Sequence, residues 1–401
     1  MRLPLLNNSA AGRPRFTFHA TRNTQHAVRN TPYAARSSPR QRRSRSESGI
    51  ALIVVMIAIF VLSMLAWQFA SRMKVETTLA RNANNEAELE WIGRSGVDYC
   101  RWILGQDGQC APYDGPNQIW AGGSSDPCAT NGGLAEVERE VQLGHGSFTW
   151  KITDLESKWN INTTLAPNGD KILDQAFIVM GMDAGMLPEL TGSILDWMDP
   201  DDHEHLGGGA ENDYYHAQNP PYDCKNGPID DLSELLFVRG ITPEIYWGGT
   251  STNHQSGIVQ QGLTRNGQPV APLTYPYGLV DFFTPISSGR ININTASAEV
   301  LQLIPGVDPT IAQAIVAGRQ GEDDGSGMLG PYPTVDAVRR LPELNPLVIN
   351  VLRQYCVTFS TNFRIEIDAR IDKYTRQFVA IVHRTDRRNP RDIQILNFYW
   401  K

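Results

Sequence analysis

The chain has 401 residues, of which 41% are hydrophobic and 20% are charged. These values are typical of a folded protein and exclude a wholly disordered or collagen-like chain. The net charge of −7 is unevenly distributed, because residues 1–48 hold ten Arg, no Lys and one acidic residue, which leaves −16 on the rest of the chain. A body with that charge repels phosphate backbones, which argues against nucleic-acid binding.

An uncharged apolar segment covers residues 50–70, where only Ser63 and Gln68 are polar. As a helix, this segment would be about 30 Å long, which matches the hydrocarbon core of a bilayer. A buried core helix is the alternative, but such a helix rarely lacks a polar face. The excess of arginine before the segment predicts a cytoplasmic amino terminus and a body across the membrane. We interpret residues 1–49 as a basic leader, with an organellar transit peptide or an over-long start as alternatives.

Helical periodicity continues beyond the apolar segment. Apolar or small residues recur every four positions at Val75, Leu79, Ala83, Ala87 and Trp91. The same face is widened by Leu89, Ile92, Gly96, Tyr99 and Ile103. Polar residues occupy the opposite face, and no proline occurs between Pro39 and Pro112. We therefore predict one helix over residues 50–104, whose second half forms an amphipathic stem.

The start of this helix resembles the processing site of a type IV prepilin. Ser48-Gly49-Ile50 precedes the apolar run, and the resemblance implies cleavage by a prepilin peptidase between Gly49 and Ile50. It also implies assembly through the apolar helix. Two positions depart from the common pattern: Ser48 stands where a basic residue is usual, and Val54 stands where most of these proteins have Glu at the fifth mature position.

Because it lacks a carboxylate at Val54, the chain resembles one branch of this family, the K-type minor pseudopilin of type II secretion. In the family, that Glu pairs with the terminal amine of the next subunit toward the tip. A subunit with no neighbour above it has no amine to neutralise, and a lone carboxylate in lipid is costly. The resemblance implies a non-enzymatic protein that caps the periplasmic pseudopilus and aids export across the outer membrane. It implies a single-pass anchor in the bacterial inner membrane and, as partners, the I- and J-type minor pseudopilins.

Strand patterns occur at both ends of the body. Alternating apolar and polar residues predict strands over 135–143, 147–153, 363–368, 377–383 and 392–400. We expect an α+β fold: a pilin-like long N-terminal helix packed on an antiparallel sheet, with a large, mainly helical domain inserted in the sheet. The layout agrees with the K-type resemblance. The predicted parts are a leader (1–49), a transmembrane and stem helix (50–104), a loop with the first strands (105–155), the inserted domain (156–356) and the final strands (357–401).

The insertion contains an internal repeat, since Trp159-Asn-Ile-Asn-Thr163 recurs as Ile291-Asn-Ile-Asn-Thr295. We expect Thr163 and Thr295 to be N-caps of the helices that follow. Each of these helices leads to a hairpin that contains Gly and Asp, and a second helix follows. The insertion is therefore predicted to consist of helix-hairpin-helix-like units.

The stretch Ile291–Arg319 also resembles the helix-hairpin-helix motif of DNA-binding proteins. A membrane-anchored, competence-like nucleic-acid-binding protein is therefore the alternative function. That motif binds phosphate through backbone N–H groups at a Gly-hydrophobic-Gly turn. Here Asp308 replaces the second Gly, and Pro309 has no N–H to donate. We interpret the hairpin as a packing unit and expect no nucleic-acid binding.

An acidic cluster lies between residues 196 and 213. Its members are Asp196, Asp199, Asp201, Asp202, Glu204, Glu211 and Asp213, with no Lys or Arg among them. Such a group repels itself unless a cation is bound, and oxygen ligands on a Gly-containing loop suit Ca²⁺. We predict a Ca²⁺ site with Asp196, Asp199, Asp201 and Glu211 as ligands. The resemblance agrees, because K-type pseudopilins hold calcium in their helical domain at such a stretch.

Two other interpretations of the acidic cluster remain: a solvated loop without metal, and a zinc site that uses His203, His205 and His216. Histidines two positions apart in a loop rarely converge on one ion. Common catalytic motifs for phosphate, zinc-protease, serine-hydrolase and dinucleotide chemistry are absent from the sequence, so we predict that the protein is not an enzyme. A paired-carboxylate hydrolase is the enzymatic alternative.

The chain has five cysteines and no CxxC pair, which argues against a structural zinc site of the usual spacing. Cys100, Cys110 and Cys128 lie close in sequence and could contribute one disulfide in an oxidising compartment. Small buried thiols are the alternative.

Overall fold

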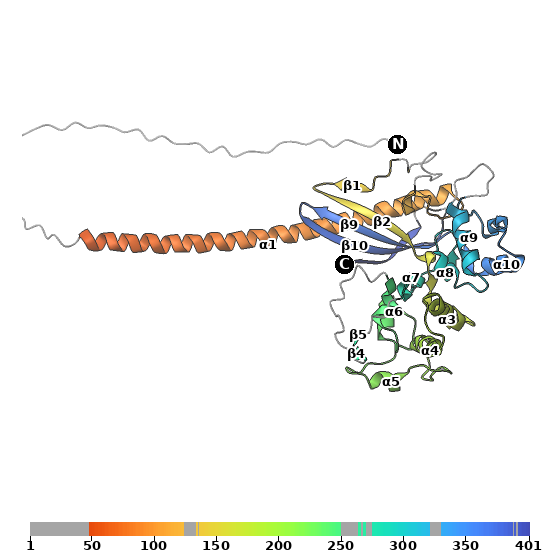
Figure 1. Ribbon diagram of the computed structural model, residues 1–401. Coiled ribbons are helices and arrows are strands. Elements are labelled where there is room, and N and C mark those ends of the chain that lie inside the picture. Colours follow the sequence, from red (N-terminus) through yellow and green to blue (C-terminus); the bar gives the residue numbers. More distant parts are fainter. Residues whose placement is uncertain are drawn as a thin grey trace, which may run out of the picture. The chain divides into compact units, whose positions relative to one another are not determined.

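The computed structural model describes residues 48–123, 134, 136–249, 264–265, 268–269, 275–320, 330–387, 389 and 392–401. The chain divides into two units, Met1–Lys74 and Val75–Lys401. Helix α1 (Ser48–Cys110) supplies the described part of the first unit and continues into the second (Figure 1). In the described part of the chain it is the one helix long and apolar enough to cross a membrane. The described residues begin at Ser48, so residues 1–47 of the predicted leader lie outside them.

A five-stranded antiparallel sheet forms the base of the second unit. Its strands are β1 (Glu140–Leu143), β2 (Gly146–Asp154), β9 (Asn362–Ile371), β10 (Tyr374–Arg384) and β11 (Ile393–Trp400). They are ordered β1-β2-β9-β10-β11, so strands from the two ends of the body meet at the β2–β9 pair (Figure 1). The predicted fold class, a pilin-like helix and antiparallel sheet with a helical insertion, is confirmed.

The last turns of α1 cover one face of this sheet. Its buried residues are Leu89, Ile92, Val97, Cys100, Ile103 and Leu104. Two glycines permit the close approach: a Cβ on Gly93 would lie 2.4 Å from Phe378, and one on Gly96 would lie 2.8 Å from Ile367. The helix ends at Cys110, six residues beyond its predicted end, and that cysteine is in a disulfide. Cys100 is a free, buried thiol, and Cys128 lies outside the described residues.

The sheet covers part of the apolar face that the sequence predicts for α1, namely Leu89, Ile92 and Ile103. The other predicted apolar residues, here called the apolar stripe, are Val75, Leu79, Ala83, Ala87 and Trp91. Val75, Leu79 and Trp91 are 57%, 61% and 70% exposed. Successive members of the stripe are rotated by about 40° around the helix axis. The stripe therefore winds around α1, and its exposed members are apolar residues that the protein's own sheet leaves uncovered.

The inserted domain follows β2 and has its own hydrophobic core. Its first half contains η2 (Leu155–Ser157), β3 (Trp159–Asn160), η3 (Ile161–Leu165), α3 (Gly169–Val179), α4 (Leu187–Met198), α5 (Asn212–His216), η4 (Leu232–Phe237) and α6 (Pro243–Trp247). A short hairpin, β4 (Thr264–Arg265) and β5 (Gln268–Pro269), precedes α7 (Leu279–Phe282) and β6 (Phe283–Thr284). The second half contains β7 (Ile291–Asn292), α8 (Ala298–Leu301), α9 (Pro309–Gln320), η6 (Val335–Arg340), α10 (Pro346–Tyr355) and β8 (Cys356–Val357).

The two halves are structural repeats. In each, a two-residue strand pairs in parallel with a second one at the end of the repeat, β3 with β6 and β7 with β8. Each hairpin turns at a glycine with φ of +82°, Gly181 in the first repeat and Gly306 in the second. Each repeat then has a 3-10 helix, η4 or η6, followed by a helix that begins with proline, α6 or α10. The internal sequence repeat therefore reflects a repeated fold.

The threonines of the two repeated motifs do not cap the helices that follow. Thr163 lies inside η3, and the N-caps of α3 and α8 are Asn168 and Ser297, so the prediction that Thr163 and Thr295 cap these helices is wrong. A 3-10 helix follows the first short strand and a hydrogen-bonded turn follows the second, which leaves each threonine inside the turn.

The second Asn of each motif clamps a distant strand-like segment. Asn162 accepts a hydrogen bond from the backbone N–H of Ile229 at 2.7 Å and donates to its carbonyl at 3.0 Å. Asn294 makes the same two bonds to Tyr332, also at 2.7 and 3.0 Å. Each clamp satisfies both backbone groups of a residue near the repeat's 3-10 helix. The Asn-Ile-Asn pattern is therefore a packing device.

Candidate metal centre

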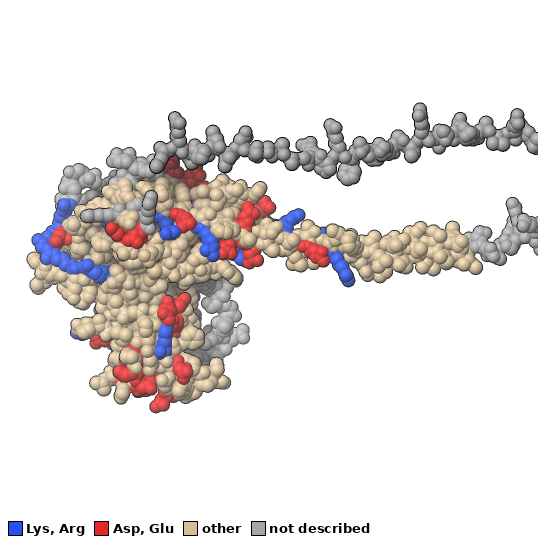
Figure 2. All heavy atoms as spheres, turned by 180° about the vertical axis from the view of Figure 1, so that it is seen from behind, with Lys and Arg blue, Asp and Glu red and all other residues tan. Residues whose placement is uncertain are grey.

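The acidic cluster surrounds the carboxyl end of α4. The apolar positions of this helix point into the core of the inserted domain, and Asp196 in its last turn is fully buried. The helix ends before Pro200, and the loop that follows returns through three glycines, Gly207–Gly209, to Glu211, which precedes α5. Acidic side chains gather at the end of the domain that carries α4 and α5 (Figure 2).

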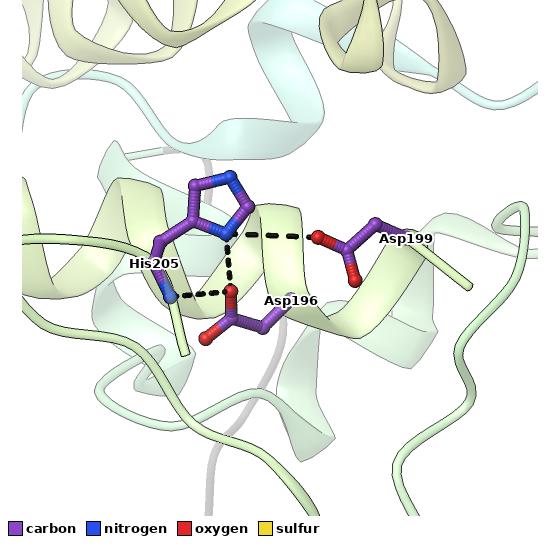
Figure 3. A group of neighbouring side chains, drawn as sticks. All are labelled: Asp196, Asp199 and His205. Carbon is purple, nitrogen blue, oxygen red and sulfur yellow. Dashed lines mark hydrogen bonds and ion pairs between the residues drawn. The ribbon is translucent and has the colours of Figure 1, made fainter. Parts of the chain in front are cut away.

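Asp196 holds the returning loop on the end of the helix. Its Oδ1 accepts a hydrogen bond from the backbone N–H of His205 at 3.1 Å and also contacts the ring nitrogen Nδ1 of His205 (Figure 3). Its Oδ2 accepts from the backbone N–H of Ala210 at 2.8 Å. A Cβ on Gly209 would lie 1.9 Å from Asp196 Oδ2, so only glycine permits this approach. Both oxygens of Asp196 are therefore already used by the protein.

Asp199, Asp201 and Glu211 form a second group, in which one carboxylate oxygen of each lies within 4.8 Å of the others. Glu211 is 4% exposed, and neither of its carboxylate oxygens has a hydrogen-bond partner, nor has Oδ1 of Asp199. Burial and the nearby Asp196 carboxylate raise the pKa of Glu211 to about 7, and burial and Asp201 raise the pKa of Asp199. Buried carboxylates without donors fit a cation, which would satisfy them.

The structure brings the four predicted ligands to one place but divides them between two groups. Asp196 lies with Asp199 and His205, and Nδ1 of His205 is 3.6 Å from Oδ2 of Asp199. Asp201 and Glu211 lie with Asp199 on the other side. Sequence reasoning missed the position of His205 beside Asp196. Its only signal was the Asp-His-Glu-His run, which does not reveal which carboxylate the ring faces.

The zinc alternative is not supported by the positions of the three histidines. The His203 ring lies 3.2 Å from Asp201, and the His216 ring lies 2.7 Å from Asp223. His205 faces Asp196 instead. Neither of the metal-capable groups in the described residues contains two histidines.

Arg239 contacts the glycine loop through a backbone carbonyl group. Its Nη1 donates to the carbonyl of Gly209 at 2.9 Å, its Nε lies 2.9 Å from Glu189 on α4, and its guanidinium lies 4.9 Å from the Tyr214 ring centroid. It thereby ties α4, the glycine loop and α5 together without contacting the ligand group described above. In the described residues, Arg239 forms no ion pair with Asp199, Asp201 or Glu211.

In the hairpin that resembles a DNA-binding motif, a backbone N–H group at the start of the second helix is already hydrogen-bonded within the protein. Oδ1 of Asp308 accepts a hydrogen bond from the backbone N–H of Ile311 at 2.9 Å, at the start of α9. Phosphate binding by such a hairpin uses free N–H groups at this place. A carboxylate there repels phosphate, which agrees with the interpretation of the hairpin as a packing unit.

A groove lies beside the apolar stripe, between α1 and the edge of the sheet. It has a volume of about 440 Å³, and its lining includes Ala83, Ala87, Phe378, Phe398 and Trp400. Phe378 and Phe398 stack with their centroids 5.6 Å apart, while Trp400 is 63% exposed. The lining also includes the charged residues Glu86, Glu90, Arg94 and Arg376, so the groove beside the stripe is partly apolar and partly charged.

A long helix with an apolar amino-terminal half, packed on an antiparallel sheet, defines a pilin-like protein, and the inserted repeats and acidic loop distinguish it from a simple one. Residues 153–247, most of the first repeat, match the family model described as type II secretion system protein K. Residues 287–354, the second repeat, match a helix-hairpin-helix motif.

Relatives and a solved structure give the same assignment. The type II secretion system protein K of Aeromonas hydrophila is 26% identical over 216 residues, which are 50% of this chain and 61% of that protein. The protein K of Pseudomonas aeruginosa is 21% identical over 69% of this chain and 74% of its own length. The fold is similar to a chain of the GspK-GspI-GspJ complex from enterotoxigenic Escherichia coli, with a TM-score of 0.57, 16% identity and coverage of 80% of this chain and 99% of that chain.

These findings confirm the predicted resemblance to the K-type family of type II secretion. The matched region spans about three fifths of the length of the first of these curated relatives.

Proposed function

We propose that this chain is a non-enzymatic minor pseudopilin that caps the periplasmic pseudopilus of a type II secretion system and aids protein export across the outer membrane. The observation that carries the proposal is the apolar stripe of α1. Val75, Leu79 and Trp91 are more than half exposed on a helix whose apolar residues between Leu89 and Leu104 are largely buried by the protein's own sheet. An exposed apolar patch of this kind is typical of an interaction surface.

Processing and anchoring follow from the start of α1. We propose that a prepilin peptidase cleaves between Gly49 and Ile50 and that the amino terminus faces the cytoplasm, with the body in the periplasm. The apolar segment from Ile50 then anchors the chain in the inner membrane as a single span. Val54 supplies no carboxylate for a neighbour's terminal amine, which is consistent with a subunit that has none above it.

The proposed partners are the I- and J-type minor pseudopilins. The solved structure with a similar fold comes from a GspK-GspI-GspJ complex, and the similarity at 16% identity itself concerns the fold. On this chain, the apolar stripe and the neighbouring groove offer a continuous surface to the stem helices of such partners. Burial of that surface would supply the hydrophobic contribution to assembly.

The acidic centre is proposed to bind Ca²⁺ as a structural ion. Asp199, Asp201 and Glu211 would provide carboxylate oxygens, and the buried oxygens of Glu211 without partners support their role. When bound, the ion neutralises the loop's negative charge. This chain's own contribution is to hold the loop on α4 through Asp196.

Co-purification from membranes tests the partner surface. The full chain is co-expressed with its I- and J-type partners, extracted in detergent and isolated by a tag on this chain. We expect Trp91→Glu to lower partner recovery at least tenfold, because it places a charge within an apolar contact. Leu347→Glu is the matched control, since Leu347 on α10 is 75% exposed but lies outside the stripe. Equal recovery with Trp91→Glu and with the unchanged chain would refute the proposed surface.

A further inference from the structure

Buried polar side chains collect where the inserted domain joins the sheet. The chain leaves the sheet after Asp154 and re-enters it at Asn362. The members of this junction cluster are each at most 5% exposed: Asp114, Asp154, Glu156, Asn292, Ser360, Asn362 and Arg384. They come from the segment after α1, from the ends of β2 and β10, from η2, and from β7 and the β8–β9 connection. The cluster therefore ties the sheet to the second repeat of the inserted domain.

The two arginines at the junction cluster both pair with the carboxylate of Asp114. Arg384 contacts Oδ2 of Asp114 and donates to the carbonyl of Ser360 at 2.6 Å. Arg387 lies 3.6 Å from Oδ1 of the same Asp114. Two guanidinium groups therefore balance Asp114, and in the described residues no Lys or Arg forms an ion pair with Asp154 or Glu156.

Glu156 is surrounded by donors. Its carboxylate accepts hydrogen bonds from the backbone N–H groups of Ser288 and Asn362 at 3.2 and 3.0 Å. It also accepts from the side-chain amide of Asn362 at 2.9 Å and from the hydroxyl of Thr361 at 2.8 Å. Because N–H groups can only donate, the Glu156 carboxylate is the acceptor in these bonds.

Asp154 has a different environment. Its Oδ1 accepts from the backbone N–H of Glu156 at 2.8 Å. Its Oδ2 lies 2.5 Å from the hydroxyl of Thr295, 2.7 Å from the hydroxyl of Ser360 and 3.1 Å from the amide nitrogen of Asn292. Both hydroxyls donate to Oδ2 in this arrangement, which lowers the pKa of Asp154 and partly offsets the effect of burial. When Oδ2 carries a proton, either hydroxyl can turn and accept it. The charged groups that face Asp154 are Glu156 on η2 and Asp114 after α1, both acidic.

We propose that a proton carried by Asp154 locks the inserted domain to the sheet and that loss of this proton in alkaline medium loosens the junction. Ionisation would place a second negative charge, with no cation of its own, beside Glu156 in a dry site. Burial, followed by the Glu156 charge, raises the pKa of Asp154 to about 8, which agrees with this arrangement. The inference does not depend on the proposed role in secretion, because it concerns the stability of this chain alone.

The sign of the pH effect follows from proton linkage. The folded chain holds the Asp154 proton up to a pH of about 8, whereas an unfolded Asp loses it near 4. Between these values the folded state binds more protons, so stability is fully present at the acidic end and falls as the pH rises. The contribution of Asp154 raises the unfolding constant up to about tenfold per pH unit in this window.

The test compares the full chain in detergent with Asp154→Asn, which mimics the protonated side chain. We expect the unfolding constant of the unchanged chain to rise relative to that of Asp154→Asn by at least tenfold between pH 6 and pH 8. We also expect Glu156→Gln to shift the upper end of this pH dependence to lower pH, because removal of the neighbouring charge lowers the pKa of Asp154. A parallel pH dependence in the unchanged chain and Asp154→Asn would overturn the proposal.

Hydrogen exchange provides a second readout that needs no variant. The amides of Ser288, Ser360 and Asn362 donate to carboxylates of the junction cluster. After correction for intrinsic exchange rates, their protection in the unchanged chain should fall at least tenfold between pH 7 and pH 9. Protection at the centre of β9 should stay constant over the same range. Unchanged protection at all three junction amides would equally refute the lock.

Discussion

At the scale of single residues, Glu211 has the environment that best suits a ligand of the proposed metal centre. Its carboxylate is 4% exposed and has no hydrogen-bond partner, whereas both oxygens of Asp196 accept backbone hydrogen bonds. A buried carboxylate without donors is costly unless a cation or a proton compensates it. The two residues are both acidic and both buried, but only Glu211 is left for a ligand.

We predict that Glu211→Gln lowers Ca²⁺ affinity at least tenfold, because the amide keeps the shape of the side chain but removes its charge. Calorimetric titration of the full chain in detergent measures this change. Glu204→Gln is the matched control, since Glu204 lies exposed in the same loop outside both metal-capable groups. A Glu211→Gln variant with unchanged affinity would exclude this residue as a ligand.

Sequence reasoning pointed to the acidic cluster because seven carboxylates without a basic residue are visible in residues 196–213, and metal binding there stays a prediction. It did not predict which of these carboxylates accept backbone hydrogen bonds and which keep oxygens free for a ligand. Whether Asp196 faces backbone N–H groups or open space depends on how the glycine loop returns to α4, and that path is set by the packing of Gly209 against the helix end. The assignment of ligands within the cluster stays a prediction.

At the scale of elements, the two repeats of the inserted domain depend on their Asn clamps. Each clamp satisfies a backbone N–H and a backbone C=O on a segment that has no sheet partner of its own. Asn294 is fully buried, whereas Asn162 is half-buried. When a clamp is lost, both backbone groups must bind water instead. Water reaches the buried site of Asn294 less easily than the half-buried site of Asn162.

We predict that Asn294→Ala lowers the free energy of unfolding by about 2–4 kcal/mol and that Asn162→Ala lowers it by about 1–2 kcal/mol, since each unsatisfied buried polar group costs about 1–3 kcal/mol. Chemical denaturation followed by tryptophan fluorescence measures both values. Asn350→Ala on the exposed face of α10 is the control and should change stability by less than about 0.5 kcal/mol. An equal, small effect of all three substitutions would show that the clamps are not structural supports.

The repetition of Asn-Ile-Asn-Thr was visible in the sequence, but its function was not. A Thr before a helix predicts an N-cap, and this prediction failed because a 3-10 turn intervenes between the motif and the helix. The partners of the clamps, Ile229 and Tyr332, lie 67 and 38 residues away from Asn162 and Asn294. No local pattern connects residues at such distances.

At the scale of the whole molecule, two hydrophobic cores lie in the unit 75–401, one beneath α1 and one in the inserted domain. The proposed Ca²⁺ site belongs to the second core, since Asp196 ends a helix that this core buries. An ion that binds only the folded loop therefore stabilises the inserted domain first.

We predict that Ca²⁺ raises the unfolding temperature of the full chain in detergent and that a chelator reverses the effect. At 100 times the dissociation constant, the stabilisation is about 2.7 kcal/mol. Scanning fluorimetry measures the shift, with Mg²⁺ as the control, because Mg²⁺ gives up its water less readily and requires near-octahedral ligands. The absence of a shift, or an equal shift with Mg²⁺, would contradict a site selective for calcium.

The sequence alone determined the apolar segment that follows Gly49, the long helix, the strands at both ends of the body and the insertion between them. These features depend on periodicity and composition, which are local properties of the chain. Tertiary structure alone decided which face of α1 is buried, which carboxylates keep free oxygens and how the junction cluster distributes its charges. Those outcomes depend on contacts between residues far apart in the chain, where packing and desolvation, and not local propensity, set the free energy.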